Sequence, residues 1–473
     1  MPGWTCTATS LFCFAGVPLF GHKYGLNSTM PALISPSRPR TGITRLTGGL
    51  LVKNHQLIPA DLWISSVTGK ILHSQQVFYE HHAIPDETID LQGKILCPGF
   101  IDVQFNGAFG FDFSTIPTDA EGGMATYEKG LRGLNRRLVR TGVTSYLPTL
   151  PSQRPEVYHQ TLKHLGPSGG KRDAWEGSES LGAHCEGPFI SPTKNGIHSL
   201  QVLQEAPNGF LDMEACYGAE NLAPSKDEAG RRSTPVTMIT AAPEVPGISS
   251  CIPSVTERGL RFAIGHTEAT YEEASTAIAA GASMITHLFN AMRSLHHRHP
   301  GVFGVLGKAE GKERPYYGVI SDGIHLHPTT VKIAWAAHPD GFILVTDAMK
   351  TVGLPDGVYD WTNGDRWVKK GAQLTREGSE TIAGGSARLV ECVSNFWTWS
   401  HASIPEVVRA VTETPAEMLG LKGVKGCLEA GADADLLVLD VREEADGRRE
   451  VKVERVWKFG VLVHDARDET VEV

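Results

Sequence analysis

The sequence predicts an α/β fold in which a (β/α)8 TIM-like barrel carries a small β-sandwich domain formed by both chain ends. Three observations lead to this prediction. The 473 residues suffice for one barrel of about 250 residues and a second, smaller unit. Eight short apolar runs, several ending in polar residues, alternate with stretches of helical character. Shorter β-like runs separated by turn residues lie on both sides of this series.

The two outer segments have the pattern of short strands. The runs GGLLV, DLWISS and TIDLQGKILCPGF begin within residues 44–98, and DADLLVLD, EVKVERVWKFG and VLVHDARDETVEV fall within residues 425–473. Glycine and charged residues separate these runs, as expected where strands are joined by turns. We therefore expect residues 44–98 and 425–473 to form one small β domain, and residues 99–424 to form the barrel.

Eight runs supply the expected barrel strands. In chain order they are FIDVQFNG, VTSYLPTL, LGAHCEGPF, VTMITAAPE, RFAIGHT, ASMITHLFNAM, YYGVISDGIH and FILVTDAM. Helices are expected between many of them, for example in residues 126–142 and 271–281, and further helices at 389–400 and 405–419. The polar segment 221–232 is expected to be an inserted surface loop.

Composition and charge limit the classes of function. There is no run of 18 apolar residues, so a membrane span is not expected. The net charge of -9 is spread along the chain without a Lys/Arg cluster, which argues against nucleic-acid binding. The eight cysteines include no CxxC pair and indicate reduced thiols, as in the cytoplasm. We therefore expect a small molecule as the binding partner.

Residues 1–43 are expected to form an extension without ordered structure. They contain no Asp or Glu, are rich in Ser and Thr, and include a mostly apolar stretch at 11–21. No Lys or Arg precedes Lys23, so the basic start of a secretory signal is missing. An organelle presequence, or a chain start at Met30, is the alternative interpretation.

Three residues at the ends of predicted strands form a candidate metal site. Glu186 ends the third strand, His266 the fifth and His287 the sixth. The carboxyl ends of barrel strands meet on one face, so these side chains are expected to converge. One Glu and two His leave a position for water in catalytic zinc sites. The sequence predicts one divalent metal, with zinc preferred over iron or cobalt; the alternative is a surface carboxylate and two core histidines.

Two further strand ends carry candidate catalytic residues. Asp347 ends the eighth predicted strand and His325 the seventh. A carboxylate beside an activated water can take its proton and pass it to a leaving amine, as amide hydrolysis requires. His325 is expected to donate to the substrate carbonyl and stabilise the oxyanion that develops there. The alternative role for Asp347 is to cap the turn that follows it.

The ordered set of motifs resembles the N-acetylglucosamine-6-phosphate deacetylases of the amidohydrolase superfamily, and their eukaryotic members in particular. The set comprises PGFIDVQFNG, HCEGPFISPTKNGIH, APE, GHT, THLFNAM, HHRHPG, DGIH and VTDAM, and the resemblance runs from about residue 45 to 465. It implies hydrolysis of N-acetylglucosamine 6-phosphate to glucosamine 6-phosphate and acetate, in amino-sugar catabolism. It also implies a homodimer.

The resemblance further implies a set of substrate contacts. Arg298 is the expected phosphate partner, supplied by a neighbouring subunit, because its planar guanidinium can make paired charge-assisted hydrogen bonds. The alternative for Arg298 is a solvated loop. Two departures from the family pattern are Ile197, where a small residue is usual, and an extra glycine in TIAGGSA, which leaves the register there open by one residue. The implied contacts are Gln104, Asn106, Ile197, His198, Asn290, Ala291, Arg298, Asp322, Gly323, Ile324, His325, Ile382, Ala383 and Gly384.

The first predicted strand distinguishes this chain from many amidohydrolases. Where these carry His-x-His for a second metal, this chain has Gln104 and Asn106. Amides are poorer ligands than imidazole for a borderline-soft metal, which favours a single ion. One rival function is a dihydropyrimidinase-like cyclic amide hydrolase, for which those histidines and usually a carboxylated lysine would be expected. The other is a non-catalytic barrel acting as a binding protein, which would typically lack a metal ligand or Asp347.

Overall fold

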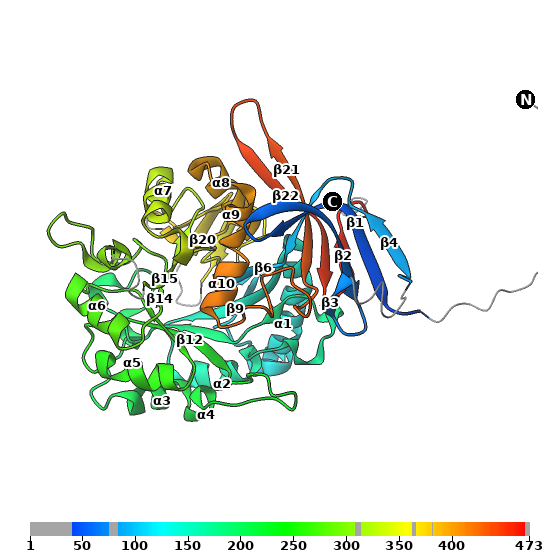
Figure 1. Cartoon of the computed structure of the whole chain (residues 1–473). Coiled ribbons are helices and arrows are strands. Elements are labelled where there is room, and N and C mark those ends of the chain that lie inside the picture. The colour runs from blue at the N-terminus through cyan, green and yellow to red at the C-terminus, as the bar shows by residue number, and fades with distance from the viewer. Residues whose placement is uncertain (1–39, 75–83, 308–313, 362–365, 381, 469–473) are drawn as a thin grey trace, which may run out of the picture. The chain divides into compact units, whose positions relative to one another are not determined.

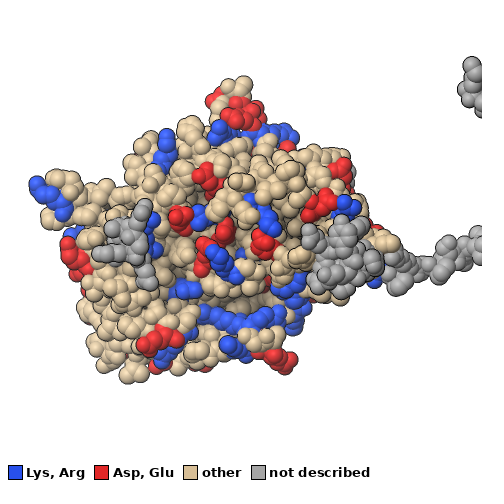
Figure 2. Space-filling model, viewed as in Figure 1, with Lys and Arg blue, Asp and Glu red and all other residues tan. Residues whose placement is uncertain are grey.

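The computed structural model describes residues 40–74, 84–307, 314–361, 366–380 and 382–468 (Figure 1). Residues 1–39, and with them most of the extension predicted at 1–43, lie outside the described residues. None of the helices within the described ranges is both long and apolar enough to cross a bilayer. On the face shown in Figure 2, Lys and Arg side chains are interspersed with Asp and Glu.

Both chain ends contribute to one eight-stranded sheet, as predicted. Its order is β23-β22-β21-β5-β1-β2-β3, with β4 paired to β1. The two ends meet where β5 and β21 pair antiparallel, and Figure 1 shows the blue and red strands side by side. The domain boundaries at residues 98 and 425 stay predictions. The strands are β1 (Ile43–Lys53), β2 (Gln56–Ser65), β3 (Lys70–Leu72), β4 (Glu87–Asp90), β5 (Ile95–Pro98), β21 (Leu436–Glu443), β22 (Arg449–Lys458) and β23 (Val461–Asp465).

All eight predicted barrel strands are present and lie in parallel, which confirms the predicted barrel. A short strand, β10 (Glu179–Ser180), adds to β9. The last strand meets the first through backbone hydrogen bonds from Asp347 N–H to the Gln104 carbonyl (3.0 Å) and from Asn106 N–H to the Ala348 carbonyl (2.8 Å). The strands are β6 (Phe100–Phe105), β9 (Val143–Pro151), β11 (Ala183–Glu186), β12 (Val236–Ala241), β13 (Arg261–Ile264), β14 (Met284–Ile285), β15 (Tyr316–Ile320) and β16 (Phe342–Val345).

Helices follow most barrel strands and bury their apolar faces against them. The helix predicted at 271–281 is α6, which starts at a capping box because Glu273 N–H donates to Thr270 Oγ1 and Thr270 N–H donates to Glu273 Oε2. The predictions at 126–142 and 389–400 are confirmed by α1 and α8. The helices are α1 (Gly123–Leu138), α2 (Pro155–Leu165), α3 (Phe210–Tyr217), α4 (Ala219–Leu222), α5 (Ile248–Glu257), α6 (Tyr271–Ala279), α7 (Pro328–Ala337) and α8 (Leu389–Ser400).

The single helix predicted at 405–419 is wrong, because the structure has two helices, α9 (Ile404–Arg409) and α10 (Glu413–Met418). Pro415 lies in the first turn of α10, where its missing N–H costs no helical hydrogen bond, whereas one continuous helix would place it in the interior. Through this break α10 packs Met418 into the apolar barrel interior. The loop predicted at 221–232 is wrong at its start, since residues 221 and 222 are buried in α4.

A small antiparallel sheet follows the last barrel strand. It comprises β17 (Gly357–Asp360), β18 (Arg366–Lys370), β19 (Gln373–Arg376) and β20 (Ile382–Gly385), and a two-stranded ribbon of β7 (Gly107–Ala108) and β8 (Phe111–Asp112) follows β6. Gly385 N–H donates to the Asp347 carbonyl at 3.2 Å, and Met349 N–H donates to the Gly385 carbonyl at 2.9 Å. The small sheet is therefore attached at the carboxyl end of the barrel, beside the residues predicted to be catalytic.

Candidate active site

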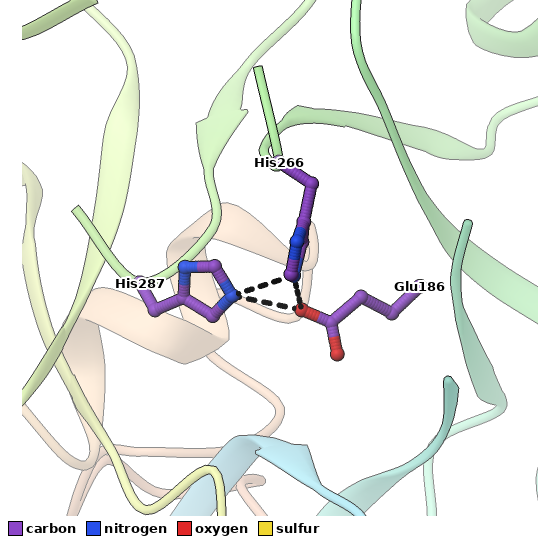
Figure 3. A group of neighbouring side chains, drawn as sticks. All are labelled: Glu186, His266 and His287. Carbon is purple, nitrogen blue, oxygen red and sulfur yellow. Dashed lines mark hydrogen bonds and ion pairs between the residues drawn. The ribbon is translucent and has the colours of Figure 1, made fainter. Parts of the chain in front are cut away.

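Glu186, His266 and His287 meet at the carboxyl ends of β11, β13 and β14 (Figure 3). All three side chains are buried. Glu186 Oε1 lies 3.2 Å from His266 Nε2 and 3.0 Å from His287 Nε2, and the two Nε2 atoms are 3.1 Å apart. The structure thus brings the three predicted metal ligands to one point.

The donor atoms have the spacing that one metal ion requires. Ligand atoms at 2.0–2.1 Å from a tetrahedral ion lie about 3.3 Å from one another, close to the observed separations. His266 Nδ1 lies 2.7 Å from the Lys194 carbonyl oxygen, which only accepts, so Nδ1 carries the proton and the Nε2 lone pair faces the common point. The residues therefore fit a divalent metal ion.

Asp347 lies beside this cluster, as predicted. Its Oδ1 accepts hydrogen bonds from Asn106 Nδ2 at 2.7 Å and from Gln104 Nε2 at 3.2 Å, and Gln104 Nε2 is also 3.0 Å from Glu186 Oε1. Burial, together with the nearby charge of Glu186, raises the pKa of Asp347. Burial also opposes ionisation of Glu186, but the adjacent His266 and His287 side chains outweigh it and lower the pKa of Glu186 well below the usual value.

Four residues of the site hold left-handed backbone conformations that are uncommon for residues other than glycine. The φ angles are 49° at His266, 26° at His287, 50° at Ala291 and 47° at Asp347. Each such residue costs on the order of 1–3 kcal/mol and persists only where its surroundings enforce it. These conformations cluster around the point where Glu186, His266 and His287 converge, here called the metal point. Their clustering supports a functional site there.

His325 is oriented by a neighbouring carboxylate. Its Nδ1 lies 2.7 Å from Asp322 Oδ2, and Asp322 Oδ1 accepts the backbone N–H groups of Ile324 and His325. Burial raises the pKa of Asp322, but the hydrogen bonds and charge of His325 outweigh it, so the pKa is lowered overall. Asp322 therefore holds Nδ1–H of His325 and leaves Nε2 for the cavity that His325 lines.

His198 presents a hydrogen-bond donor to the same cavity. Its Nδ1 accepts the backbone N–H of Ser152 at 3.1 Å, so in the neutral ring Nε2 carries the proton. Burial lowers the pKa of His198 to about 3, which keeps the ring neutral near pH 7. Sequence reasoning missed Ser152, which lies two residues beyond the second predicted strand and directly follows β9, a placement like that of the other site residues.

The cavity at the metal point has a volume of about 230 Å³. Asn106 Oδ1 and Asn290 Nδ2 are buried without a hydrogen-bond partner among the described residues, so an acceptor and a donor are free to meet a ligand. Pro151, Gly196 and Met349 line the cavity and were not predicted. The predicted residues that line it are Asn106, Glu186, Ile197, His198, His266, His287, Asn290, Ala291, His325, Asp347, Ile382 and Gly384.

Several predicted contacts do not line this cavity. Gln104 lies behind it, bonded to Glu186 and Asp347. Asp322, Gly323 and Ile324 do not line it either, and Asp322 holds His325 from outside. The side chain of Ala383, in β20, lies outside the described part of the structure. Arg298 is exposed in the loop after β14 and does not line the cavity of its own chain.

Comparison with known proteins agrees with this geometry. The model of the amidohydrolase family matches residues 95–463. An N-acetylglucosamine-6-phosphate deacetylase from Danio rerio is 38% identical over 403 residues, covering 84% of this chain and 93% of that protein. The Homo sapiens counterpart is 37% identical, with coverages of 84% and 92%.

A solved structure supports the same assignment. It is a mutant of the Mycobacterium smegmatis N-acetyl-D-glucosamine-6-phosphate deacetylase in complex with N-acetyl-D-glucosamine-6-phosphate. It matches with a TM-score of 0.70 at 26% identity, covering 90% of this chain and 99% of that chain. The protein is therefore a member of the amidohydrolase family and, within it, of the N-acetylglucosamine-6-phosphate deacetylases.

Proposed function

We propose that this protein hydrolyses N-acetylglucosamine 6-phosphate to glucosamine 6-phosphate and acetate, a step of amino-sugar catabolism. The convergence of Glu186, His266 and His287 beside Asp347 in one cavity carries this proposal. The cofactor is one divalent ion, with zinc as the first choice because three N/O ligands at tetrahedral spacing suit it. The cytoplasm is the proposed location, since the six described cysteines are free thiols.

Each residue around the metal point has a separate role in amide hydrolysis. A divalent ion held by Glu186, His266 and His287 would act as a Lewis acid and would lower the pKa of bound water towards about 7. The side-chain amides of Gln104 and Asn106 both donate hydrogen bonds to Oδ1 of Asp347. Oδ2 is therefore the oxygen that takes the proton of the attacking water. As the new carbon–oxygen bond forms and the carbon–nitrogen bond breaks, Asp347 delivers that proton to the sugar nitrogen. With both ring nitrogens protonated and Nδ1–H held by Asp322, His325 donates Nε2–H to the developing oxyanion, and His198 supplies a second N–H for the substrate.

The phosphate group needs a cation that the cavity of one chain does not supply. The described residues that line the cavity include no Lys or Arg. Arg298 is exposed, and the proposed arrangement is a homodimer in which Arg298 of one subunit reaches the phosphate bound to the other.

The activity is tested by acetate release from N-acetylglucosamine 6-phosphate and from N-acetylglucosamine, with protein of measured metal content. We expect kcat/KM to be about 10- to 100-fold higher for the phosphorylated sugar, the value of a charge-assisted contact. Arg298→Ala should remove most of this preference, and Arg132→Ala, on the exposed side of α1, should leave it unchanged. Equal rates on both sugars would contradict the role of Arg298.

Subunit mixing tests whether Arg298 acts across a dimer. Arg298→Ala retains Asp347, and Asp347→Asn retains Arg298. If each site borrows Arg298 from its partner, mixed dimers contain one complete site, and activity on the phosphorylated sugar recovers after the two variants are unfolded and refolded together. No recovery, with light scattering showing dimers, would place Arg298 in its own subunit's site.

A further inference from the structure

Glu244, the last residue of the APE motif, has no role in the reaction described above. It follows β12, is half-buried and does not line the cavity. Both of its carboxylate oxygens are bound by the turn that follows β13. Oε2 accepts the Thr267 hydroxyl at 2.5 Å, and Oε1 accepts the backbone N–H of Glu268 at 2.5 Å. These two short hydrogen bonds hold the turn immediately after the metal ligand His266.

This turn needs such support because its backbone is strained. His266 has a φ of 49°. The preceding residue, Gly265, is so close to β12 and β14 that a Cβ atom there would lie 2.7 Å from Thr240 Cγ2 and 2.8 Å from Thr286 Cβ. A strained segment keeps its conformation only where neighbouring groups enforce it. Glu244 supplies that support after His266, while the Lys194 carbonyl orients the imidazole ring itself.

Thr267 extends the same support to the substrate side of the cavity. Its N–H donates to the Ala291 carbonyl at 3.1 Å, and its own carbonyl accepts the N–H of Arg293 at 3.1 Å. Asn290 and Ala291 line the cavity. Through Thr267, the turn held by Glu244 is therefore hydrogen-bonded to residues 291 and 293. These residues belong to the segment that carries the two lining residues.

We propose that Glu244 is a positioning residue. It fixes both the orientation of the His266 side chain and the position of the Asn290–Ala291 backbone. Loss of its carboxylate then weakens metal binding and sugar binding at once, although Glu244 touches neither. The sugar-binding part rests on the proposed function, and the metal-binding part does not. Partners that orient metal ligands from behind typically change metal affinity or activity 10- to 100-fold when mutated.

The test is Glu244→Gln, which replaces one acceptor oxygen by an amide nitrogen that can only donate. We expect the metal dissociation constant, measured by competition with a chromophoric chelator, to rise about 10-fold or more. The visible absorption spectrum of the cobalt-substituted protein should change, because it reports ligand geometry. At saturating metal, KM for N-acetylglucosamine 6-phosphate should rise. The matched control is Glu257→Gln at the exposed end of α5, which should change none of the three.

A second pair of variants keeps the proposal testable if Glu244→Gln does not fold. Thr267→Val keeps the shape but removes the hydroxyl that binds Glu244, and it should weaken metal binding, whereas Thr267→Ser should retain wild-type affinity. The double variant Glu244→Gln/Thr267→Val should be no weaker than the poorer single variant, because both break one contact.

Unchanged metal affinity and cobalt spectrum in the folded variants would overturn the proposal, even if their thermal stability fell. A lower metal affinity with an unchanged KM would overturn the coupling to the sugar side. Absence of acetate release by the wild-type protein would instead count against the proposed function, and the metal affinity and the cobalt spectrum would still decide the role of Glu244.

Discussion

Three histidines at the cavity each have one ring nitrogen bound by a partner outside it, and this decides the chemistry of the other nitrogen. The Lys194 carbonyl holds the proton of His266 on Nδ1, so Nε2 offers a lone pair. In His198 the backbone N–H of Ser152 occupies Nδ1, so Nε2 offers a proton. The third is His325, bound by Asp322. In the proposed mechanism, one residue type thus serves as metal ligand and as hydrogen-bond donor within one cavity, because the partners differ.

Asp347→Asn tests the proton carrier. An amide oxygen is a far weaker base than a carboxylate, so we expect kcat to fall by about 10²- to 10⁴-fold. Metal content and the circular dichroism spectrum should be unchanged, since Asp347 is not among the three converging ligands. Asp360→Asn, on the exposed edge of β17, is the matched control and should keep wild-type kcat. Near-normal turnover in the metal-loaded Asp347 variant would assign the proton transfer to another group.

At the scale of elements, the small sheet β17–β20 supports one wall of the cavity. Trp367 and Leu374 are buried against Met349, and Ile197 packs on the same cluster. Met349 and Ile197 both line the cavity. This apolar cluster is separate from the main core of the barrel, so the sheet can shape the cavity without holding the barrel together.

Trp367→Ala should therefore affect substrate binding more than global stability. Removing the ring withdraws support from Met349 and Ile197, and we expect KM to rise about 10-fold, equivalent to about 1.4 kcal/mol of binding free energy. Steady-state kinetics and thermal unfolding measure the two effects. Trp175→Ala is the control, because that side chain is 64% exposed. A wild-type KM combined with a large fall in Tm would show that the cluster stabilises the barrel instead.

At the scale of the whole molecule, a buried group of charges joins the barrel to the sheet formed by the chain ends. Lys458 Nζ on β22 lies 2.6 Å from Glu179 Oε1 on β10 and 2.8 Å from Asp435 Oδ2. Lys425 Nζ lies 2.8 Å from Asp433 Oδ2 and 2.9 Å from Asp435 Oδ2. The three carboxylates are close enough to hold a metal ion, but the two ammonium groups already neutralise much of their charge. We therefore interpret this cluster as structural.

The cluster predicts a loss of stability in acid. Burial raises the pKa of Asp433, but the charge of Lys425 and hydrogen bonds from Lys425 and Lys70 outweigh it, so the pKa lies well below its usual value. A carboxylate whose folded pKa is lowered contributes stability above its unfolded pKa of about 3.9, and this contribution is lost as the pH falls towards the folded pKa. We expect the free energy of unfolding, measured with urea from pH 3 to 7, to decline below about pH 4.

Asp433→Asn checks the origin of that decline. Removing one partner of a buried ion pair leaves charge uncompensated, so we expect a loss of about 3 kcal/mol at pH 7. The variant should then lose less stability than the wild type between pH 4 and pH 3. Asp360→Asn, which is fully outside the cluster, should follow the wild-type curve. Parallel pH curves for the wild type and Asp433→Asn would mean that other carboxylates cause the acid sensitivity.

The sequence by itself determined the barrel, the pairing of the chain ends and the candidate site residues that the structure brings together. These features follow from local pattern, because a polar residue that directly follows an apolar strand lies on the face where all barrel strands end. Glu186, His266, His287 and Asp347 were identified in this way. One helix prediction was wrong, at 405–419, because Pro415 suits a first turn better than a helix interior.

Only the tertiary structure decided which atom of each side chain faces the cavity. Ser152 and His198 are 46 residues apart, and Lys194 and His266 are 72 apart, so no local periodicity relates them. The placement of Asp322 behind His325 likewise depends on the bend of a loop in space. The physical reason is that hydrogen bonds between distant segments form only after the strands assemble, whereas strand and helix patterns are present in the unfolded chain.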